Sequence, residues 1–554
     1  MDVLRSFNAR IILKAEKEHP LGSHWINEDV KPLPPSRRTW GVWSFVSFWA
    51  INNLVIYSWT TGSTLIGLGL SVWQAMLAVI IARIIIILIA VFNGYVGAEW
   101  HIGFAVLSRF VWGFWGSFVP LVQRIILSMV WMGVQAWTGG LCISAMLSAI
   151  FPSYQNMRNT MPASANMQTK QFVGFVIFNL MTCAVIWKPV EKTRWLFFAF
   201  NIVTFLTMLG LLAWSVDTAG GVGRLLSAPG KTQGSYETGW AIVKAISSVI
   251  GSIAVGLTNQ PDYSRFATKP GDQVHGQIFS IFFFGTIVPF LGCVTASATQ
   301  QIYGEIVWNP PDILARILDD NYTSKARAGC FFAAVGLTLS QLAINCIDNA
   351  FSGGFDLAGL FPRYLNIRRG AYLTLVIAIL FQPWQLLSSA SVFLSVLGVY
   401  STFLGPMVGI MITDYWFIRR RRVKLSDLYK PSPSSIYWFT KGFNYRSFVA
   451  WILGFIFLLP GFVHNVNTKI HVPEAFKNLY YLSFPLGFAI SATVFYGLNS
   501  FFPPAGLGEI DEFDMFGTFT ETEARRLGVN PLTLTAVDFP SKLITGSTTS
   551  EKTI

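Results

Sequence analysis

The sequence is poor in charge. Only 12% of its 554 residues are Asp, Glu, Lys or Arg, whereas 53% are hydrophobic. A soluble domain carries about 25% charged residues and needs them on its solvated surface. The composition therefore excludes a cytosolic enzyme, a disordered scaffold and a secreted disulfide-linked module. It predicts an all-α polytopic membrane protein, embedded in the lipid bilayer.

Cysteine is also scarce, and the chain lacks catalytic patterns. The five cysteines lie in or beside apolar segments and show neither C-x-x-C nor Cys/His spacing, which favours small buried packing residues over metal ligands or disulfides. All six histidines fall in loops or at the edges of apolar runs, and no HExxH, P-loop or GxGxxG context occurs. We therefore expect no metal, no cofactor and no enzymatic activity.

Long apolar runs, in contrast, are plentiful. A transmembrane helix needs about 20 mostly apolar residues, and about twelve such runs are present. The predicted spans are 41–67, 71–93, 117–148, 171–188, 195–216, 241–258, 277–298, 327–350, 371–388, 391–416, 446–463 and 478–500. They leave a cytosolic N-terminal segment (1–40), a cytosolic loop (417–445) and a flexible cytosolic tail (501–554), and they place two additional spans (446–500) after a core (41–416).

The distribution of basic residues predicts the orientation. With the N-terminus inside, the run Arg419-Arg420-Arg421-Arg422 falls in an inner loop, whereas the outer loop 301–326 is acidic. An even number of spans returns the C-terminus to the cytosol. The net charge of +12 is then explained by loops that face an anionic inner leaflet. Nucleic-acid binding is not expected, because no basic surface with interleaved aromatic residues is present.

Polar residues inside the spans are the candidates for function, because lipid offers them no hydrogen-bond partners. In the third span, Trp131 and Gln135 are four residues apart and share one helix face. A Trp ring and a Gln amide suit a planar ring edged with C=O and N–H groups. The alternative is that both side chains pack or hydrogen-bond within the helix bundle.

The eighth span carries Asn345, Asp348 and Asn349. The two asparagines share a face and are suited to pair with an imide or carboxamide edge, while Asp348 is a candidate proton carrier. The alternative is a structural ion pair between Asp348 and a basic residue such as Arg83 or Lys244.

The first and sixth spans are interrupted at corresponding places. The first contains Asn52-Asn53 and then Thr60-Thr61-Gly62-Ser63, and the sixth contains Gly251-Ser252-Ile253-Ala254. Paired interruptions of this kind indicate discontinuous helices around a midplane site in an inverted-repeat transporter. Arg124 lies one turn inside a helix start, and we expect its side chain to reach the interface.

These residues bring a resemblance into view. The chain resembles the fungal Fur-type branch of the nucleobase–cation symporter 1 family, which comprises permeases for uracil, allantoin and uridine, with a related branch for thiamine or nicotinamide riboside. The stretches that carry the resemblance include Thr39-Trp40-Gly41, Asn93-Gly94-Tyr95, Trp100-His101-Ile102-Gly103, Gln135-Ala136-Trp137, Asn259-Gln260-Pro261-Asp262-Tyr263-Ser264-Arg265-Phe266, Asp356-Leu357-Ala358-Gly359-Leu360-Phe361-Pro362 and Phe439-Thr440-Lys441-Gly442.

The resemblance implies a fold of five plus five inverted-repeat helices with two extra helices, and transport by alternating access. It implies that Trp131 stacks on the substrate ring and that Gln135 and Asn349 bond its edge, with Asn345 and Asn53 nearby. Bacterial relatives have a second aromatic residue where this chain has Ile253.

The coupling ion is inferred from a difference between this sequence and the bacterial members of the family. Bacterial relatives bind sodium through small hydroxyl residues on the eighth helix, but the corresponding stretch here includes Ala343 and Ile344. We therefore expect proton coupling rather than sodium, with Asp348 as the carrier. Asp356 and Asp262 are assigned to gating salt bridges near the inner face.

These inferences together predict a plasma-membrane proton symporter for a uracil-, allantoin- or uridine-like ring. A thiamine or nicotinamide riboside transporter of the same family is one alternative. Another is a nutrient receptor that binds the same ligand without net transport. The sequence does not predict the oligomeric state.

Overall fold

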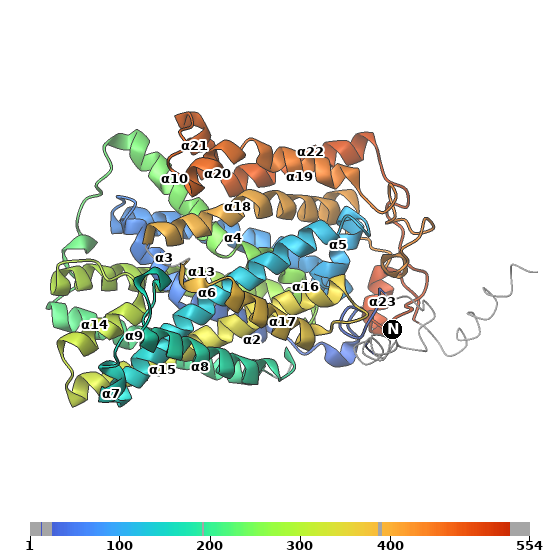
Figure 1. Ribbon diagram of the computed structural model, residues 1–554. Coiled ribbons are helices and arrows are strands. Elements are labelled where there is room, and N and C mark those ends of the chain that lie inside the picture. Colours follow the sequence, from blue (N-terminus) through green and yellow to red (C-terminus); the bar gives the residue numbers. More distant parts are fainter. Residues whose placement is uncertain (1–12, 14–24, 191–192, 386–389, 532–554) are drawn as a thin grey trace, which may run out of the picture.

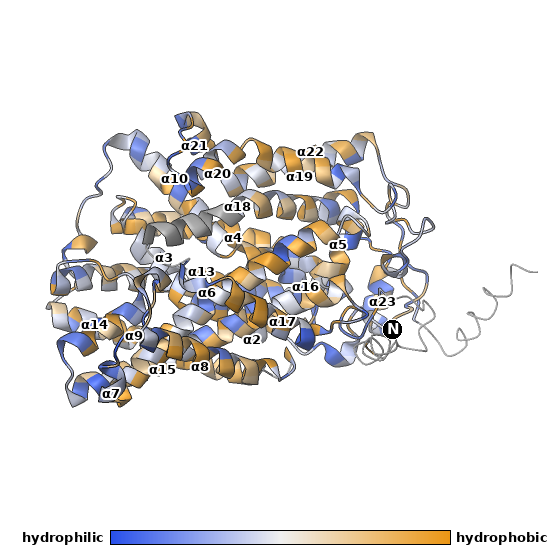
Figure 2. Cartoon of the chain, in the orientation of Figure 1, coloured by the Kyte–Doolittle hydropathy of each residue, from blue (hydrophilic) through white to orange (hydrophobic). Residues whose placement is uncertain are grey.

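The computed structural model describes residue 13 and residues 25–190, 193–385 and 390–531 (Figure 1). In these ranges the chain forms helices and no β-strand, only isolated bridges, which confirms the all-α prediction. Seven of the described helices are long and apolar enough to cross a membrane, and a bent pair makes an eighth. Figure 2 shows hydrophobic colour along these helices and hydrophilic colour concentrated at the ends of the bundle.

The longest continuous helices form the body of the bundle (Figure 1). They are α4 (Val72–Trp100), α6 (Phe118–Ile150), α8 (Thr169–Ile186), α9 (Arg194–Ala219), α10 (Gly234–Ser252), α13 (Pro270–Tyr303), α15 (Ser324–Ile344), α18 (Ala390–Thr413) and α22 (Ser483–Phe501). Their count is lower than the twelve predicted spans because several of those spans are broken or short.

The first span is discontinuous, as predicted. It consists of α2 (Val42–Asn53) and α3 (Ile56–Ile66), with Val55 in extended conformation between them. A break exposes backbone carbonyls that lipid cannot satisfy. Here the Tyr57 hydroxyl donates to the carbonyl oxygen of Asn52 at 2.7 Å. The chain thus supplies its own partner at the break.

The sixth span is broken as well. It consists of α10 (Gly234–Ser252), α11 (Ala254–Thr258) and α12 (Gln260–Ser264), and Ile253 ends the first of these helices with non-helical angles (φ −120°, ψ 5°). The prediction of paired interruptions in the first and sixth spans is therefore confirmed.

The eighth span differs from its prediction. It does not end near residue 350, because α15 continues through a π-helical segment, η5 (Asn345–Phe351), into α16 (Ser352–Leu360). A π-helical turn is rare, and it is frequent at functional sites. It begins at Asn345, the first of the polar residues singled out in this span.

The remaining helices are shorter. They are α5 (Phe104–Trp112), α14 (Pro310–Asp320), α17 (Ile367–Leu380), α19 (Tyr445–Ile456), α20 (Leu459–Val466) and α21 (Glu474–Tyr481). The pair α19 and α20 is bent by 56°, which fits the proline at the start of α20. The predicted ninth span, 371–388, ends early in α17, and its residues 386–388 lie outside the described ranges.

Residues 25–40 and the short helix α23 (Glu521–Leu527) meet at one end of the bundle, here called the tail end (Figure 1). Arg38 Nη1 lies 2.8 Å from Glu523 Oε1. Burial favours the neutral carboxyl, but hydrogen bonds from His101, Thr520 and Arg38 outweigh it and hold the pKa of Glu523 well below its ordinary value. The described part of the predicted tail, residues 501–531, contacts the rest of the protein: the ring of Phe519 lies 5.8 Å from that of Trp100, and Asp511 accepts from the backbone N–H of Ser426 at 2.9 Å.

Candidate functional site

Trp131 and Gln135 lie side by side on α6 and are buried. The Trp131 ring meets the ring of Tyr57, with 5.8 Å between centroids and a tilt of 55°. Tyr57 comes from the first turn of α3, directly after the break in the first span. Sequence reasoning missed Tyr57, although an aromatic residue four positions after Asn53 was a signal for it.

The π-helical segment presents a row of amides. Asn349 Nδ2 donates to Asn345 Oδ1 at 3.2 Å, while Nδ2 of Asn345 is buried and donates to no protein acceptor. Gln341, one turn earlier, is fully buried, and neither of its amide atoms has a hydrogen-bond partner. Sequence reasoning passed over Gln341, although its spacing of four from Asn345 placed it on the same face.

Asp348 faces the break in the sixth span. A β-carbon placed on Gly256 would lie 3.6 Å from Asp348 Oδ2 and 3.4 Å from Ile253. Oδ1 of Asp348 is buried and accepts no hydrogen bond from the protein. The eighth span therefore brings an acidic group directly against the discontinuity of the sixth.

The alternative pairing of Asp348 with Arg83 or Lys244 is wrong. Arg83 donates from Nε to the carbonyl oxygen of Gly285 at 2.8 Å, and Lys244 Nζ lies 5.2 Å from the centre of the Tyr481 ring. No salt bridge within the described ranges includes Asp348.

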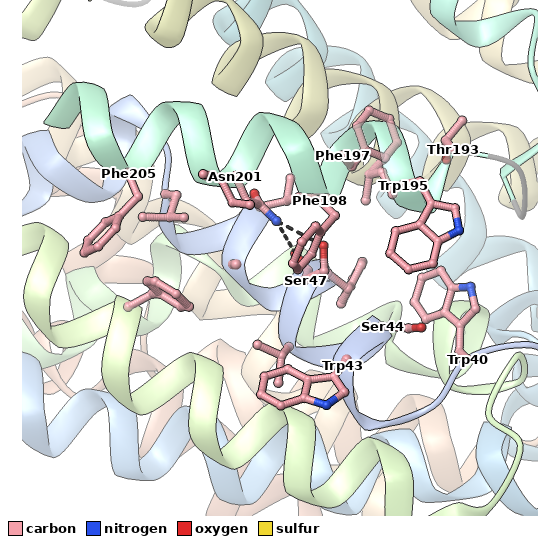
Figure 3. A pocket seen from close by; sticks show the side chains of 18 of the residues that line it. Trp40, Trp43, Ser44, Ser47, Thr193, Trp195, Phe197, Phe198, Asn201 and Phe205 are labelled. Atoms are coloured by element: carbon pink, nitrogen blue, oxygen red, sulfur yellow. Dashed lines mark hydrogen bonds between the residues drawn. The ribbon is translucent and has the colours of Figure 1, made fainter.

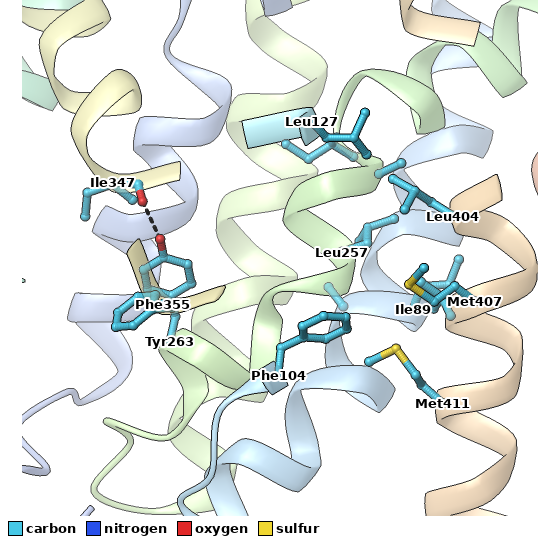
Figure 4. Packing of buried hydrophobic residues seen from close by; sticks show 14 of the residues in the cluster. Ile89, Phe104, Leu127, Leu257, Tyr263, Ile347, Phe355, Leu404, Met407 and Met411 are labelled. Carbon is cyan, nitrogen blue, oxygen red and sulfur yellow. Dashed lines mark hydrogen bonds between the residues drawn. The ribbon is translucent and has the colours of Figure 1, made fainter. Parts of the chain in front are cut away.

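The same segment is anchored to the sixth span from the other side. The hydroxyl of Tyr263, at the end of α12, donates to the backbone carbonyl of Ile347 (Figure 4). The ring of Phe355 packs beside Tyr263, with 5.9 Å between the ring centroids (Figure 4). The packing fixes the position of η5 relative to the sixth span.

The first-span asparagines are held by their own helix. Asn53 Nδ2 donates to the carbonyl oxygen of Trp49 at 2.6 Å, and Asn52 Nδ2 donates to that of Phe48 at 3.3 Å. The side-chain oxygens of both asparagines are buried and accept no hydrogen bond. The two side-chain amide oxygens, those of Asn52 and Asn53, thus remain available as acceptors at the end of α2.

Arg124 does not reach the interface, contrary to the prediction. It is fully buried, with Nη2 at 3.1 Å from Asp262 Oδ2 and Nε at 3.1 Å from Asp356 Oδ2. The Asp262 and Asp356 side chains draw it inward, and the Phe104 ring lies 3.9 Å from the guanidinium carbon. These three charged residues are called the charged triad below.

The charged triad lies between the polar cluster and the tail end. Arg124 precedes Trp131 by seven residues, or about 10 Å along α6. Asp262 Oδ1 accepts from the backbone N–H of Phe104 at 2.8 Å, and Arg124 Nη2 also donates to Ser352 Oγ at 3.1 Å. The triad therefore ties α5, α6, α12 and α16 together on one side of the cluster.

The chemistry of this arrangement is recognition rather than bond cleavage. An aromatic pair follows the break of the first span, an acid lies against the break of the sixth, and two amides pair in the π-helical segment. In the described part of the chain, no three or more His, Cys, Asp or Glu side chains are grouped to hold a metal ion. Unpartnered polar atoms inside a membrane protein mark a ligand or ion pathway.

Comparison with known proteins fits this geometry. The profile of a family of permeases for cytosine/purines, uracil, thiamine and allantoin matches residues 32–487. The transporter aclS of Aspergillus oryzae is 43% identical over 92% of this chain and 91% of its own length. A thiamine transporter of Saccharomyces cerevisiae is 34% identical over 91% of this chain and 84% of its own length.

A solved structure shows the same fold. It is that of Mhp1, a nucleobase–cation-symport-1 family transporter, in a closed conformation with bromovinylhydantoin bound. The TM-score is 0.69 at 21% identity, over 91% of this chain and 99% of Mhp1. The five-plus-five architecture expected from the sequence is therefore confirmed. The chain is a multi-pass membrane transporter of small ring compounds and not an enzyme, and it belongs to the nucleobase–cation symporter 1 family.

Proposed function

We propose that the protein takes up a nucleobase-type ring compound, of the uracil, allantoin or uridine class, across the plasma membrane together with a proton. Both chain ends lie in the cytosol, and no cofactor other than the coupling proton takes part. Two contacts carry the proposal: Trp131 meets Tyr57 just after the break of the first span, and Asp348 lies against Gly256 just after the break of the sixth.

The ring is held by aromatic faces and amide edges. Trp131 and Tyr57 meet at 55°, so a planar solute stacks on the indole and meets the edge of the phenol. Gln135 and Asn349 supply donors and acceptors for a C=O/N–H edge. The buried polar atoms of Asn345 and Gln341 give the site further groups with which to recognise it.

We assign the proton to Asp348. Its Oδ1 is buried without a partner, and its Oδ2 faces the break at Ile253 and Gly256. A proton on this carboxyl removes a buried charge and adds a donor at the substrate site. Binding of substrate and proton together then favours closure of the outer pathway.

The charged triad is proposed as the inner gate. Asp262 and Asp356 hold Arg124 across the route from the polar cluster to the tail end. Opening toward the cytosol then requires these ion pairs to part. Because two carboxylates face one guanidinium, the triad retains one excess negative charge unless a proton neutralises it.

An uptake panel tests the proposal. Cells without their own permeases receive the gene and are given labelled uracil, allantoin, uridine or thiamine. We expect accumulation of one of the first three, which an uncoupler abolishes and removal of external sodium leaves unchanged. Binding without accumulation, or accumulation that requires sodium, contradicts the proposal.

The proton assignment has its own test. Asp348→Asn keeps the size of the side chain but cannot be ionised. We expect the variant to bind substrate and to lose pH-dependent accumulation, measured as the ratio of internal to external label between pH 5 and pH 8. Unchanged pH dependence of accumulation in Asp348→Asn excludes Asp348 as the carrier.

Thiamine is the second candidate substrate. The relative that transports thiamine is 34% identical to this chain, and an acid at the site, Asp348, would attract a cationic ring. In the same panel, accumulation of thiamine but not of uracil, allantoin or uridine selects this function.

A further inference from the structure

An apolar groove lies between α2 and α9 (Figure 3). It has a volume of about 660 Å³, and Ile347 of η5 contributes to its lining. Trp43 and Trp195 line it with 74% and 69% of their surfaces exposed. Tryptophan at such positions is typical of the membrane interface.

Two polar side chains of this groove satisfy each other, while the buried Trp40 Nε1 has no hydrogen-bond partner. Asn201 Nδ2 donates to the carbonyl oxygen of Ser47 at 2.9 Å and to its hydroxyl at 3.1 Å (Figure 3). A polar ring needs several convergent donors and acceptors, which this wall does not present. An acyl chain, in contrast, fits an apolar wall that opens toward lipid.

A basic pocket of about 280 Å³ adjoins the groove at the tail end, and Val190 lines both. Among the described residues, Arg37, Lys188 and Arg368 line it together with the carboxylate of Asp29. That carboxylate accepts from the backbone N–H of Ile367 at 3.2 Å. Lys188 and Arg368 are the exposed basic residues of this lining, and an anionic group between them would be attracted by both.

We propose that an anionic phospholipid binds across these two cavities, with its phosphate in the basic pocket and one acyl chain in the groove. The position matches the inner leaflet if the chain ends are cytosolic, which is the topology of the proposed function. Basic pockets between transmembrane helices on the cytosolic side recognise anionic headgroups. Because Val190 lines both cavities, the site for the acyl chain is next to the site for the headgroup.

In this arrangement the lipid contacts two segments of the proposed substrate site, α2 and η5. Ser44 and Phe48 of α2 line the groove, and Phe351 of η5 lines the basic pocket. A bound lipid therefore stabilises the position of α2 relative to the π-helical segment η5. The expected consequence is a more stable protein in membranes that contain anionic lipid.

Thermal unfolding of the purified full-length protein tests the headgroup. The detergent-solubilised protein is titrated with short-chain phosphatidylserine, with phosphatidylcholine of the same chain length, and with water-soluble glycerophosphoserine. We expect a saturable rise of the midpoint with phosphatidylserine alone. An equal rise with phosphatidylcholine, or with glycerophosphoserine, overturns the proposal, because the first needs no basic pocket and the second needs no groove.

Charge variants locate the headgroup. Lys188 and Arg368 are exposed, so Lys188→Ala and Arg368→Ala leave the core intact. Each is expected to raise the apparent dissociation constant for phosphatidylserine about fivefold. Arg526→Ala removes an exposed charge of α23 outside the pocket and is expected to change nothing. An equal response of all three variants overturns the proposal.

A bulky substitution in the groove tests the position of the acyl chain. Ser44→Trp fills the groove and is expected to weaken phosphatidylserine binding at least fivefold, whereas Ser500→Trp adds the same side chain on the exposed face of α22 and is expected to have no effect. If Ser44→Trp binds as the unmodified protein does, the acyl chain does not lie in the groove. Because binding is measured without transport, this outcome is independent of the uptake panel.

Discussion

The polar cluster at the broken helices and the acidic side chains of Glu99 and Asp414 near the tail end are both buried, but neither Glu99 nor Asp414 has a buried oxygen without a hydrogen-bond partner. Glu99 of α4 accepts from Tyr415 and from Arg421, whose Nε lies 3.0 Å away. Arg419 Nε donates to Asp414 at 3.0 Å. In the polar cluster, Asn345, Asp348 and Gln341 each retain at least one buried polar atom without a protein partner.

The difference separates stability from function. Burying a polar group without a hydrogen bond costs about 1–3 kcal/mol, so a chain keeps such groups only where something else compensates them. Near the tail end the chain compensates its own charges and gains a fixed structure. At the polar cluster the compensation is left to a substrate and a proton.

The largest expected effect is on the charged triad, which lies between these two regions. Arg124→Met leaves Asp262 and Asp356 buried without their cation. We expect a loss of about 3–5 kcal/mol of stability, seen as a lower thermal midpoint of the purified protein. Asp356→Asn keeps the pair of Arg124 with Asp262 and should cost less. Equal stability of Arg124→Met and the unmodified protein would falsify a structural role for these ion pairs.

Trp131→Ala tests the functional side of the comparison. Removing the stacking surface should cost about 1.5–3 kcal/mol of substrate binding, a rise in the apparent KM of about 10- to 150-fold. Trp137 is the matched control, because its ring packs against Phe175 and Trp384, each at 6.1 Å between centroids. Trp137→Ala is expected to lower the amount of folded protein but not the affinity. A normal KM for Trp131→Ala removes Trp131 from the site.

Tyr57 gives a finer test. The ring contacts Trp131, whereas the hydroxyl only bonds the Asn52 carbonyl. Tyr57→Ala should raise the apparent KM about 3- to 10-fold through loss of the aromatic pair, and Tyr57→Phe should stay close to the unmodified value. If Tyr57→Phe raises the apparent KM in uptake assays as much as Tyr57→Ala does, the hydroxyl rather than the ring is the functional group.

The smallest effects are expected for two substitutions, one of a side chain with a hydrogen-bond partner (Tyr415) and one of a side chain without a partner (Gln341). Tyr415→Phe removes one hydrogen bond to Glu99 and should lower stability by about 0.5–1.5 kcal/mol. Gln341→Leu replaces an amide whose atoms have no partner, so stability should be unchanged or higher while substrate affinity falls. Thermal midpoints and uptake measured on the same preparations decide the matter. Destabilisation by Gln341→Leu would contradict the distinction between the two regions.

The broken first and sixth spans were predictable because they leave a local signature. The Asn52-Asn53 pair and the glycines around Ile253 interrupt apolar runs at matching places, and lipid does not tolerate an unpaired backbone without a purpose. The face shared by Trp131 and Gln135 follows from helical spacing alone. The roles of these residues still rest on the proposed function.

Contacts between distant segments were not predictable in this way. Arg124 resembled an interfacial arginine because nothing near it in sequence is acidic, yet Asp262 and Asp356 reach it from two other helices. The π-helical turn that begins at Asn345 also has no signature in residue spacing.

The sequence by itself determined that the chain crosses a membrane, where its helices break and which side chains are polar inside lipid, because these follow from composition and periodicity. Only the tertiary structure decided that Tyr57 joins Trp131, that Arg124 is enclosed by two acids and that Asp348 faces the sixth span without a basic partner. The physical reason is that pairing energies depend on the distance between side chains, and distances across a helix bundle are set by packing rather than by spacing along the chain.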